Sequence, residues 1–237
     1  MIYAAALAAL AFAVLGPLFA PDNPAHLVGR SYTPPGGGHL LGTDDLGRDI
    51  WSRVLAGGRS LIVLPLIATG ITCGLGAAIG ITSGYLAGRF DRGVTVLTGL
   101  MLVIPSVLVL LVILDGWGYS DLTLIAAVVV TGTPFVTRLA RATTFRSARS
   151  GYVEQAAGLG ESTTSILVRE IAPNVAGPLL ADAGMRLVTS IEIIATAAFL
   201  GFGPDTANWA TMVNENLQGI TLSPWSVAAP AAALAFL

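Results

Sequence analysis

A series of long apolar runs limits this chain to a narrow set of folds. They occupy residues 2–20, 61–86, 94–114, 121–137 and 179–202, and a sixth begins near Trp225 and ends with the sequence at Leu237. About 20 apolar residues in helical form cross the hydrocarbon core of a bilayer. The pattern therefore predicts an all-α, polytopic membrane helix bundle of about six transmembrane helices, of which the last is incomplete.

Composition agrees with a membrane environment. Hydrophobic residues make up 54% of the chain and charged residues 11%, and the mean hydropathy is +0.77. Such a chain cannot cover itself with a normal water-exposed surface. The first run could instead be a signal peptide, but it lacks a basic start and a clear small-x-small cleavage site.

The arginines indicate the orientation, because basic residues in short loops stay in the cytoplasm. The short loop 87–93 and the longer segment 138–177 are rich in arginine, whereas the arginines of segment 21–60 are offset by aspartates. We expect the N-terminus and segment 138–177 in the cytoplasm and segment 21–60 outside. The chain then divides into a first helix with an extracytoplasmic segment, 1–60, and a core transmembrane domain, 61–237.

A polar segment at about 150–174 separates two apolar runs and is expected to form two short helices. Glu154 falls in the first turn of one helix, where a negative charge meets the positive end of the helix dipole. Gly158 and Gly160 can supply a left-handed end, and Ser162 can cap a second helix that should stop before Pro173. Helices this short are marginal alone, which suggests a partner surface; an ordinary interfacial loop is the alternative.

The extracytoplasmic segment carries a second polar motif, His39-Leu-Leu-Gly-Thr-Asp-Asp-Leu-Gly-Arg-Asp-Ile-Trp-Ser-Arg53. Thr43 or Asp44 is expected to cap a helix that places Asp49 and Arg53 one turn apart on a shared face. An amphipathic helix at the outer interface would also explain this spacing.

Small residues and prolines mark special positions inside the spans. Gly76, Gly80, Gly84 and Gly88 recur every four residues and predict a stripe against which another helix packs closely. The prolines within spans should kink or break them. These are Pro65, Pro105 and Pro134.

Three charges lie in the fifth apolar run. Each costs about 2.5–3.5 kcal/mol near a bilayer centre, so they should face protein or water. Asp182 and Arg186 can pair one turn apart, whereas Glu192 has no partner at helical spacing in its own span. Glu192 is therefore a candidate for lining a polar pathway.

The sequence argues against an enzyme. It has neither a lysine nor a phosphate-binding Gly-x-x-x-x-Gly-Lys-Ser/Thr loop, and its two histidines, His26 and His39, lie in the outer segment. The single Cys73 excludes an intrachain disulfide and a cysteine metal cluster. We expect no catalytic residue, no metal and no nucleic-acid partner.

Both polar motifs resemble one family. The outer motif is similar to the Gly-Thr-Asp-x-x-Gly-Arg-Asp-x-x-Ser-Arg signature of the dipeptide, oligopeptide and nickel ABC importer permeases, the binding-protein-dependent transport system inner membrane components. The inner segment resembles the EAA loop of these permeases at Glu154, Ala156, Gly160, Ile171 and Pro173; Gln155 and Ala172 depart from it. Further agreement lies at Ile104-Pro-Ser106, Arg138-Leu-Ala-Arg141, Phe199-Leu-Gly-Phe-Gly203, Asn208-Trp209 and Pro224-Trp225.

The resemblance implies a type I importer permease fold in a bacterial cytoplasmic membrane. It implies a second homologous permease subunit, two ATP-binding cassette subunits that hold ATP and Mg²⁺ and dock on the EAA-like loop, and an extracytoplasmic solute-binding protein. Peptides are the expected substrate, with nickel chelates, glutathione-like compounds or export as alternatives, and a non-transporting scaffold or channel subunit as a further one. Because the family continues through a full sixth helix, truncation is favoured over a re-entrant final segment.

Overall fold

The computed structural model describes residues 2–203 and 206–237, with side chains from residue 8 onward. Within these ranges the chain forms helices and isolated β-bridges but no strand. It folds into two compact units, one made of residues 1–65, 114–124 and 191–237, the other of residues 66–113 and 125–190. The helices α3, α5, α6 and α9 each run from one unit into the other.

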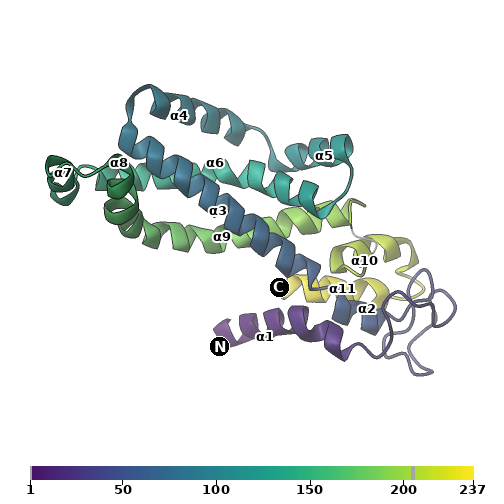
Figure 1. Cartoon of the computed structure of the whole chain (residues 1–237). Coiled ribbons are helices and arrows are strands. Elements are labelled where there is room, and N and C mark those ends of the chain that lie inside the picture. The colour runs from purple at the N-terminus through teal and green to yellow at the C-terminus, as the bar shows by residue number, and fades with distance from the viewer. Residues whose placement is uncertain (1, 204–205) are drawn as a thin grey trace. The chain divides into compact units, whose positions relative to one another are not determined.

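The first unit begins with α1 (Ile2–Leu15) and the 3-10 turn η1 (Gly16–Phe19) and continues through the outer segment to α2 (Ile50–Ala56). It ends with α10 (Trp209–Asn216), the 3-10 turn η3 (Leu217–Gly219) and α11 (Trp225–Ala235). Helices α10 and α11 contact each other, and α2 contacts α11. The outer segment before α2 is an irregular loop, which Figure 1 shows beside α2.

Trp209 is the centre of this unit. It is 1% exposed, donates a 2.6 Å hydrogen bond from Nε1 to the Val54 carbonyl, and stacks on Phe12 with ring centroids 6.0 Å apart. Gly57 and Gly58 make room for it, because a Cβ at either position would lie 2.7 Å from the indole. A single aromatic side chain thus holds α1, α2 and α10 together.

The second unit contains most of α3 (Ser60–Leu86), α4 (Gly88–Val103), α6 (Asp121–Ser147) and α9 (Ala172–Phe199), together with most of α5 (Ser106–Trp117). Gly76, Gly80 and Gly84 of α3 lie against α6, so that an added Cβ would meet Val136, Ala140 or Thr144 at under 3 Å. Gly88 lies outside this contact: it is the first residue of α4, has φ +69°, and its Cβ position is open. Three of the four glycines therefore permit the close approach of α3 and α6.

Proline positions explain where spans bend. Between Val103 and Ser106, at Ile104-Pro105, α4 and α5 meet at 86°, so the expected third span is a broken pair of helices. Pro65 and Pro134 lie inside α3 and α6, which continue through them. Proline lacks the N–H of the helix ladder, and of these three prolines Pro105 is the one that follows the end of a helix.

By length and composition, the described residues hold two helical stretches apolar enough to cross a membrane. These are Ile50–Leu86 and Asp121–Ser147, with a third if the bent pair Gly88–Val103 and Ser106–Trp117 forms one span. Shorter apolar helices cover Ala8–Phe19 and Trp225–Ala235. The all-helical membrane class is confirmed, while the number of spans remains a prediction.

The predicted helix start in the outer motif was wrong. Neither Thr43 nor Asp44 caps a helix; α2 begins at Ile50, and Asp49 is its cap, accepting 2.8 Å and 2.7 Å bonds from Ser52 N and Oγ. Gly47 adopts a left-handed φ of +86°, which interrupts any helix over 44–48. Asp49 and Arg53 nevertheless lie one turn apart as expected, because Arg53 N donates a 3.1 Å helical hydrogen bond to Asp49 O.

Candidate functional site

The predicted first helix of the EAA-like segment is α7 (Gly151–Gly158). One face of α7 buries Val153 and Ala156, and Glu154 in the first turn is exposed. Such an amphipathic helix has an inner face fixed by its own chain and an outer face available to another molecule.

A Schellman motif ends this helix. Glu161 N donates to Ala156 O at 3.2 Å and Gly160 N donates to Ala157 O at 3.0 Å, while Gly160 has φ +82°. These two bonds satisfy carbonyls that the helix end leaves without partners. The predicted left-handed conformation of Gly160 is confirmed; Gly158 remains inside the helix.

The second helix starts as predicted but continues further. Ser162 caps it, with Oγ accepting from Ser165 N at 3.2 Å, and the short α8 (Thr163–Ser165) leads into the π-helical turn η2 (Ile166–Ile171). The chain then passes directly into α9, so the expected stop before Pro173 was wrong. In the wider π turn Ala172 N donates to Leu167 O, one residue further back than in an α-helix, and Pro173, which has no N–H to donate, follows directly.

A small hydrophobic core fixes the segment to the rest of the second unit. Val153, Ala156, Ile166, Ile171 and Val175 are buried together, with Ile81 and Tyr85 of α3 packed against them. Figure 1 shows α7 and α8 at the end of α3 and α6. Of the family-motif residues, Ala156 and Ile171 therefore lie inside this core, whereas Glu154, Gly160 and Pro173 are exposed.

Leu159 is a surface residue that the sequence reasoning missed. It is the C-cap of α7 and is 78% exposed. A large exposed apolar side chain beside a rigid turn is typical of a contact surface when neighbours contribute to it, and Tyr152 on the same helix is 37% exposed. The sequence did not predict this exposure, because it follows from the position of Leu159 at the C-cap of α7.

A cluster of ion pairs organises the outer segment. Arg53, 2% exposed, pairs with the fully buried Asp44 and, at 3.0 Å, with Glu215 of α10. Arg48 pairs with Asp44 at 2.7 Å and with Glu215 at 3.2 Å. Burial first, and the Asp44 carboxylate next, raise the pKa of Asp45 above its ordinary value.

Glu215 lies about 160 residues from its partners, so no local pattern in the sequence could have paired them. Asn216 reinforces the link, since its Oδ1 accepts a 3.0 Å bond from Asp45 N. The outer motif therefore serves to attach the loop to α10.

His39, Asp22 and Asp49 lie close together in the same segment, with ligand atoms within 4.8 Å of one another. These groups already bond to protein atoms: His39 Nδ1 lies 3.1 Å from Asp49 Oδ1, and Asp49 Oδ2 is the cap of α2. The cluster is explained by the start of α2.

The three charged residues of α9 comprise one ion pair and one carboxylate without an ion pair to any described residue, as the sequence predicts. Asp182 and Arg186 form the predicted ion pair at 3.4 Å, and the Arg186 guanidinium lies 4.9 Å from the Phe135 ring centroid. Glu192 is exposed, and no described residue forms an ion pair with it. It presents an uncompensated carboxylate on the surface of an apolar helix.

Comparison with known proteins assigns these features to a class. Residues 70–237 match the family of binding-protein-dependent transport system inner membrane components. The chain is 32% identical over 203 residues to a probable D,D-dipeptide transport system permease protein of Escherichia coli, covering 85% of this chain and 68% of that protein. It is 30% identical to an oligopeptide permease protein of Bacillus subtilis, covering 84% and 66%, and 31% identical to a dipeptide permease protein of Haemophilus influenzae, covering 92% and 77%.

The helical membrane fold and the EAA-like segment define a transport permease subunit rather than an enzyme. The chain belongs to the family of binding-protein-dependent transport system inner membrane components. It spans about two thirds of the length of the first two curated relatives named above.

Proposed function

We propose that this chain is a permease subunit of an ATP-driven importer that carries di- or oligopeptides across the bacterial cytoplasmic membrane. A second, homologous permease subunit completes the pathway, two ATP-binding cassette subunits bind ATP and Mg²⁺, and an extracytoplasmic solute-binding protein delivers the peptide. The full set of six spans, with the N-terminus in the cytoplasm, belongs to this proposal.

The geometry of the EAA-like segment carries the proposal. A helix that transmits force must move as a rigid body with the spans behind it. Here α7 ends in a Schellman motif and is held by a core that includes Ile81 of α3 and Val175 of α9. Displacement of α7 is therefore transmitted to two long helices.

The residues of the EAA-like segment then fall into two groups with different roles. Glu154 and Leu159 on the exposed surface would contact a groove of the ATPase, with Gly160 fixing the turn between them and the next helix. Ala156 and Ile171 would anchor the segment from inside, and Pro173 would set the π turn that joins it to α9.

Alternating access would follow from this connection. ATP-driven closure of the ATPase pair moves the two coupling helices together and opens the pathway toward the binding protein, and hydrolysis resets it. The close contact of Gly76, Gly80 and Gly84 with α6 would keep that helix pair rigid, and the exposed Glu192 would face the pathway or the second permease subunit. A carboxylate in that position avoids lipid, where it would be costly.

The names of three relatives refer to dipeptide or oligopeptide transport and so support peptides as the substrate. Glutathione permease proteins match at 29–31% identity. Nickel chelates are the weaker alternative. The direct test is to purify the complete complex with its binding protein and identify the retained solute by mass spectrometry. Recovery of peptides supports the proposal. Recovery of a nickel complex with no peptide would overturn peptides as the proposed substrate.

A further inference from the structure

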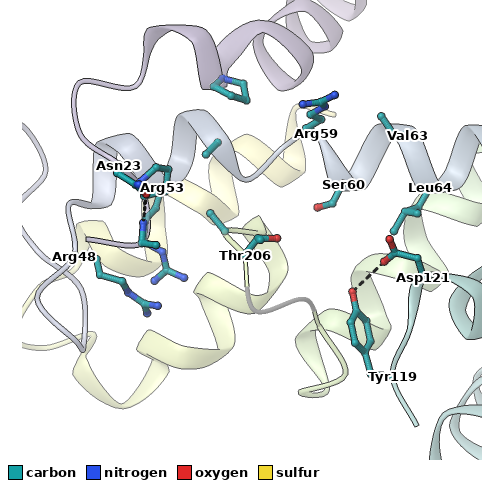
Figure 2. A pocket seen from close by; sticks show the side chains of 15 residues that line it. Asn23, Arg48, Arg53, Arg59, Ser60, Val63, Leu64, Tyr119, Asp121 and Thr206 are labelled. Atoms are coloured by element: carbon teal, nitrogen blue, oxygen red, sulfur yellow. Dashed lines mark hydrogen bonds between the residues drawn. The ribbon is translucent and has the colours of Figure 1, made fainter. Parts of the chain in front are cut away.

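The first unit contains a cavity of about 770 Å³ at the outer end of α3. Figure 2 shows residues from separate parts of the unit around it: Arg48 just before α2 and Arg53 in α2, Arg59 and Ser60 where α3 begins, and Asp121 at the start of α6. A volume of this size is in the range that holds a small organic molecule.

The charged side chains that line this cavity are mainly cationic. Among the residues that the structure describes, Arg48, Arg53 and Arg59 line it, against the carboxylate of Asp121. The carboxylates that neutralise Arg48 and Arg53, namely Asp44, Asp45 and Glu215, are not part of the lining. Arg59 is therefore the lining cation whose charge remains available to attract an anionic ligand.

Arg53, which also lines the cavity, is already held by protein groups. Its two terminal nitrogens bond to Asp44 and Glu215, and its buried Nε has no hydrogen-bond partner among the described residues. Because this Nε is closed off from solvent, Arg53 fixes the wall of the cavity and does not bind a ligand through this atom. Arg59, in contrast, is exposed and forms no ion pair with any described residue.

We propose that this cavity binds the carboxylate of the transported solute. Arg59 supplies the accessible charge, and the ion pairs of Arg53 with Asp44 and Glu215 hold the wall of the cavity in place. Arginine suits this task because its planar group matches the geometry of a carboxylate. The inference rests on the proposed function, since it names the chemical group by which the permease recognises a peptide.

The test uses the complete complex in proteoliposomes, with trialanine and trialanine amide as solutes and the binding protein saturated with each. Removing one charge-assisted hydrogen bond corresponds to about a tenfold change. We expect wild type to take up trialanine about ten times faster than the amide, and Arg59→Gln to lower trialanine uptake to the rate of the amide. Arg59→Lys should keep most of the preference, because it keeps the charge.

Arg30→Gln is the matched control, since Arg30 is an exposed arginine of the same outer segment that does not line the cavity. It should behave as wild type. An equal loss of both solutes in Arg59→Gln would overturn the inference, because Arg59 would then contact the binding protein or support the fold. An unchanged preference in Arg59→Gln would overturn it as well.

These outcomes are distinct from failure of the proposed function. A wild-type complex that hydrolyses ATP but takes up neither trialanine nor its amide would overturn peptide import and this inference with it. If Arg59→Gln does not assemble, Arg59→Lys decides the question: loss of the preference for the free carboxylate despite normal assembly and a retained charge would contradict an ionic contact with the solute.

Discussion

Arg53 and Asp44 form an ion pair that is almost completely removed from solvent, with 2% and 0% of their side chains exposed. Glu215 of α10 shares Arg53 with Asp44, and Arg48 bridges the same two carboxylates. Breaking one member of a buried pair leaves an uncompensated charge, which typically costs about 3–5 kcal/mol. The outer segment is therefore fixed to α10 by charge as well as by the packing around Trp209.

Asp45 makes this cluster dependent on pH. Burial and the Asp44 carboxylate raise its pKa in the folded state, so the folded protein binds this proton more tightly than the unfolded chain does. Ionisation of Asp45 therefore costs stability as pH rises from the ordinary carboxyl range through the raised pKa. We expect Asp45→Asn to raise the melting temperature of the detergent-solubilised complex at neutral pH and to lose this advantage at acidic pH.

Asp115→Asn provides the control, because Asp115 is exposed and no described residue pairs with it. The melting temperature of that variant should differ little from wild type at both pH values. Asp45 also forms an ion pair with Arg48 at 3.2 Å. A lower melting temperature of Asp45→Asn at neutral pH would show that this ion pair outweighs the desolvation of Asp45.

The sequence predicted local features best. The place of Glu154 in the first turn of α7, the left-handed Gly160, the Ser162 cap and the break at Pro105 all depend on neighbouring residues and are confirmed. The errors arose where residues far apart in the sequence determine the local structure. Asp44 was expected to cap a helix but is taken by Arg48 and Arg53, and its partner cluster includes Glu215 from the other end of the chain.

Pro173 shows a second limit of sequence reasoning. Proline usually ends a helix, yet the π turn before it lets the chain continue for 28 residues of α9. The π turn begins and ends with Ile166 and Ile171, which are buried in the core beneath α7, a contact that caps and prolines in the sequence do not predict. The resemblance supplied candidate residues, whose role stays a prediction, but the sequence did not show which of them are buried and which are exposed.

The orientation can be tested by labelling cysteines in intact cells. In a Cys73→Ser background, a cysteine at Ser31 should react with a membrane-impermeant maleimide, because the arginine pattern places segment 21–60 outside. A cysteine at Ser150 should react only after the membrane is permeabilised. The reverse pattern would contradict the orientation and the docking of ATPases on α7.

Gly160→Val tests the rigid turn after α7. Gly160 has φ +82°, where a β-branched residue is strained by about 1–2 kcal/mol, although the space around its Cβ position is open. We expect uptake and solute-stimulated ATPase activity to fall together while the subunit still inserts. Gly158→Ala is the matched control: Gly158 is helical and equally open, so activity should persist. Normal coupled ATPase activity in Gly160→Val would contradict the proposed role of the turn.

Ile171 and Leu159 should separate anchoring from docking. Ile171 is 0% exposed in the core beneath α7, so Ile171→Ala should destabilise the subunit by about 2–5 kcal/mol, measured as a lower melting temperature. Leu159 is 78% exposed, so Leu159→Ala should leave the melting temperature of the isolated subunit unchanged and weaken co-purification of the ATPase. Equal melting temperatures for both variants would contradict this division.

The exposed carboxylate of Glu192 on α9 has two possible roles that one experiment can distinguish. It is exposed on α9 without an ion pair from any described residue, so its partner must be water, solute or another subunit. Glu192→Gln keeps the shape and most of the hydrogen bonding but removes the charge. If Glu192 lines the pathway, assembly should persist while the uptake rate or solute preference changes; if it pairs with a cation on the second permease subunit, co-purification should fall. Thr189→Val, an exchange one turn earlier on α9, controls for changes to the helix surface. Unchanged uptake of several peptides together with poor co-purification would contradict the pathway role and assign Glu192 to the subunit interface.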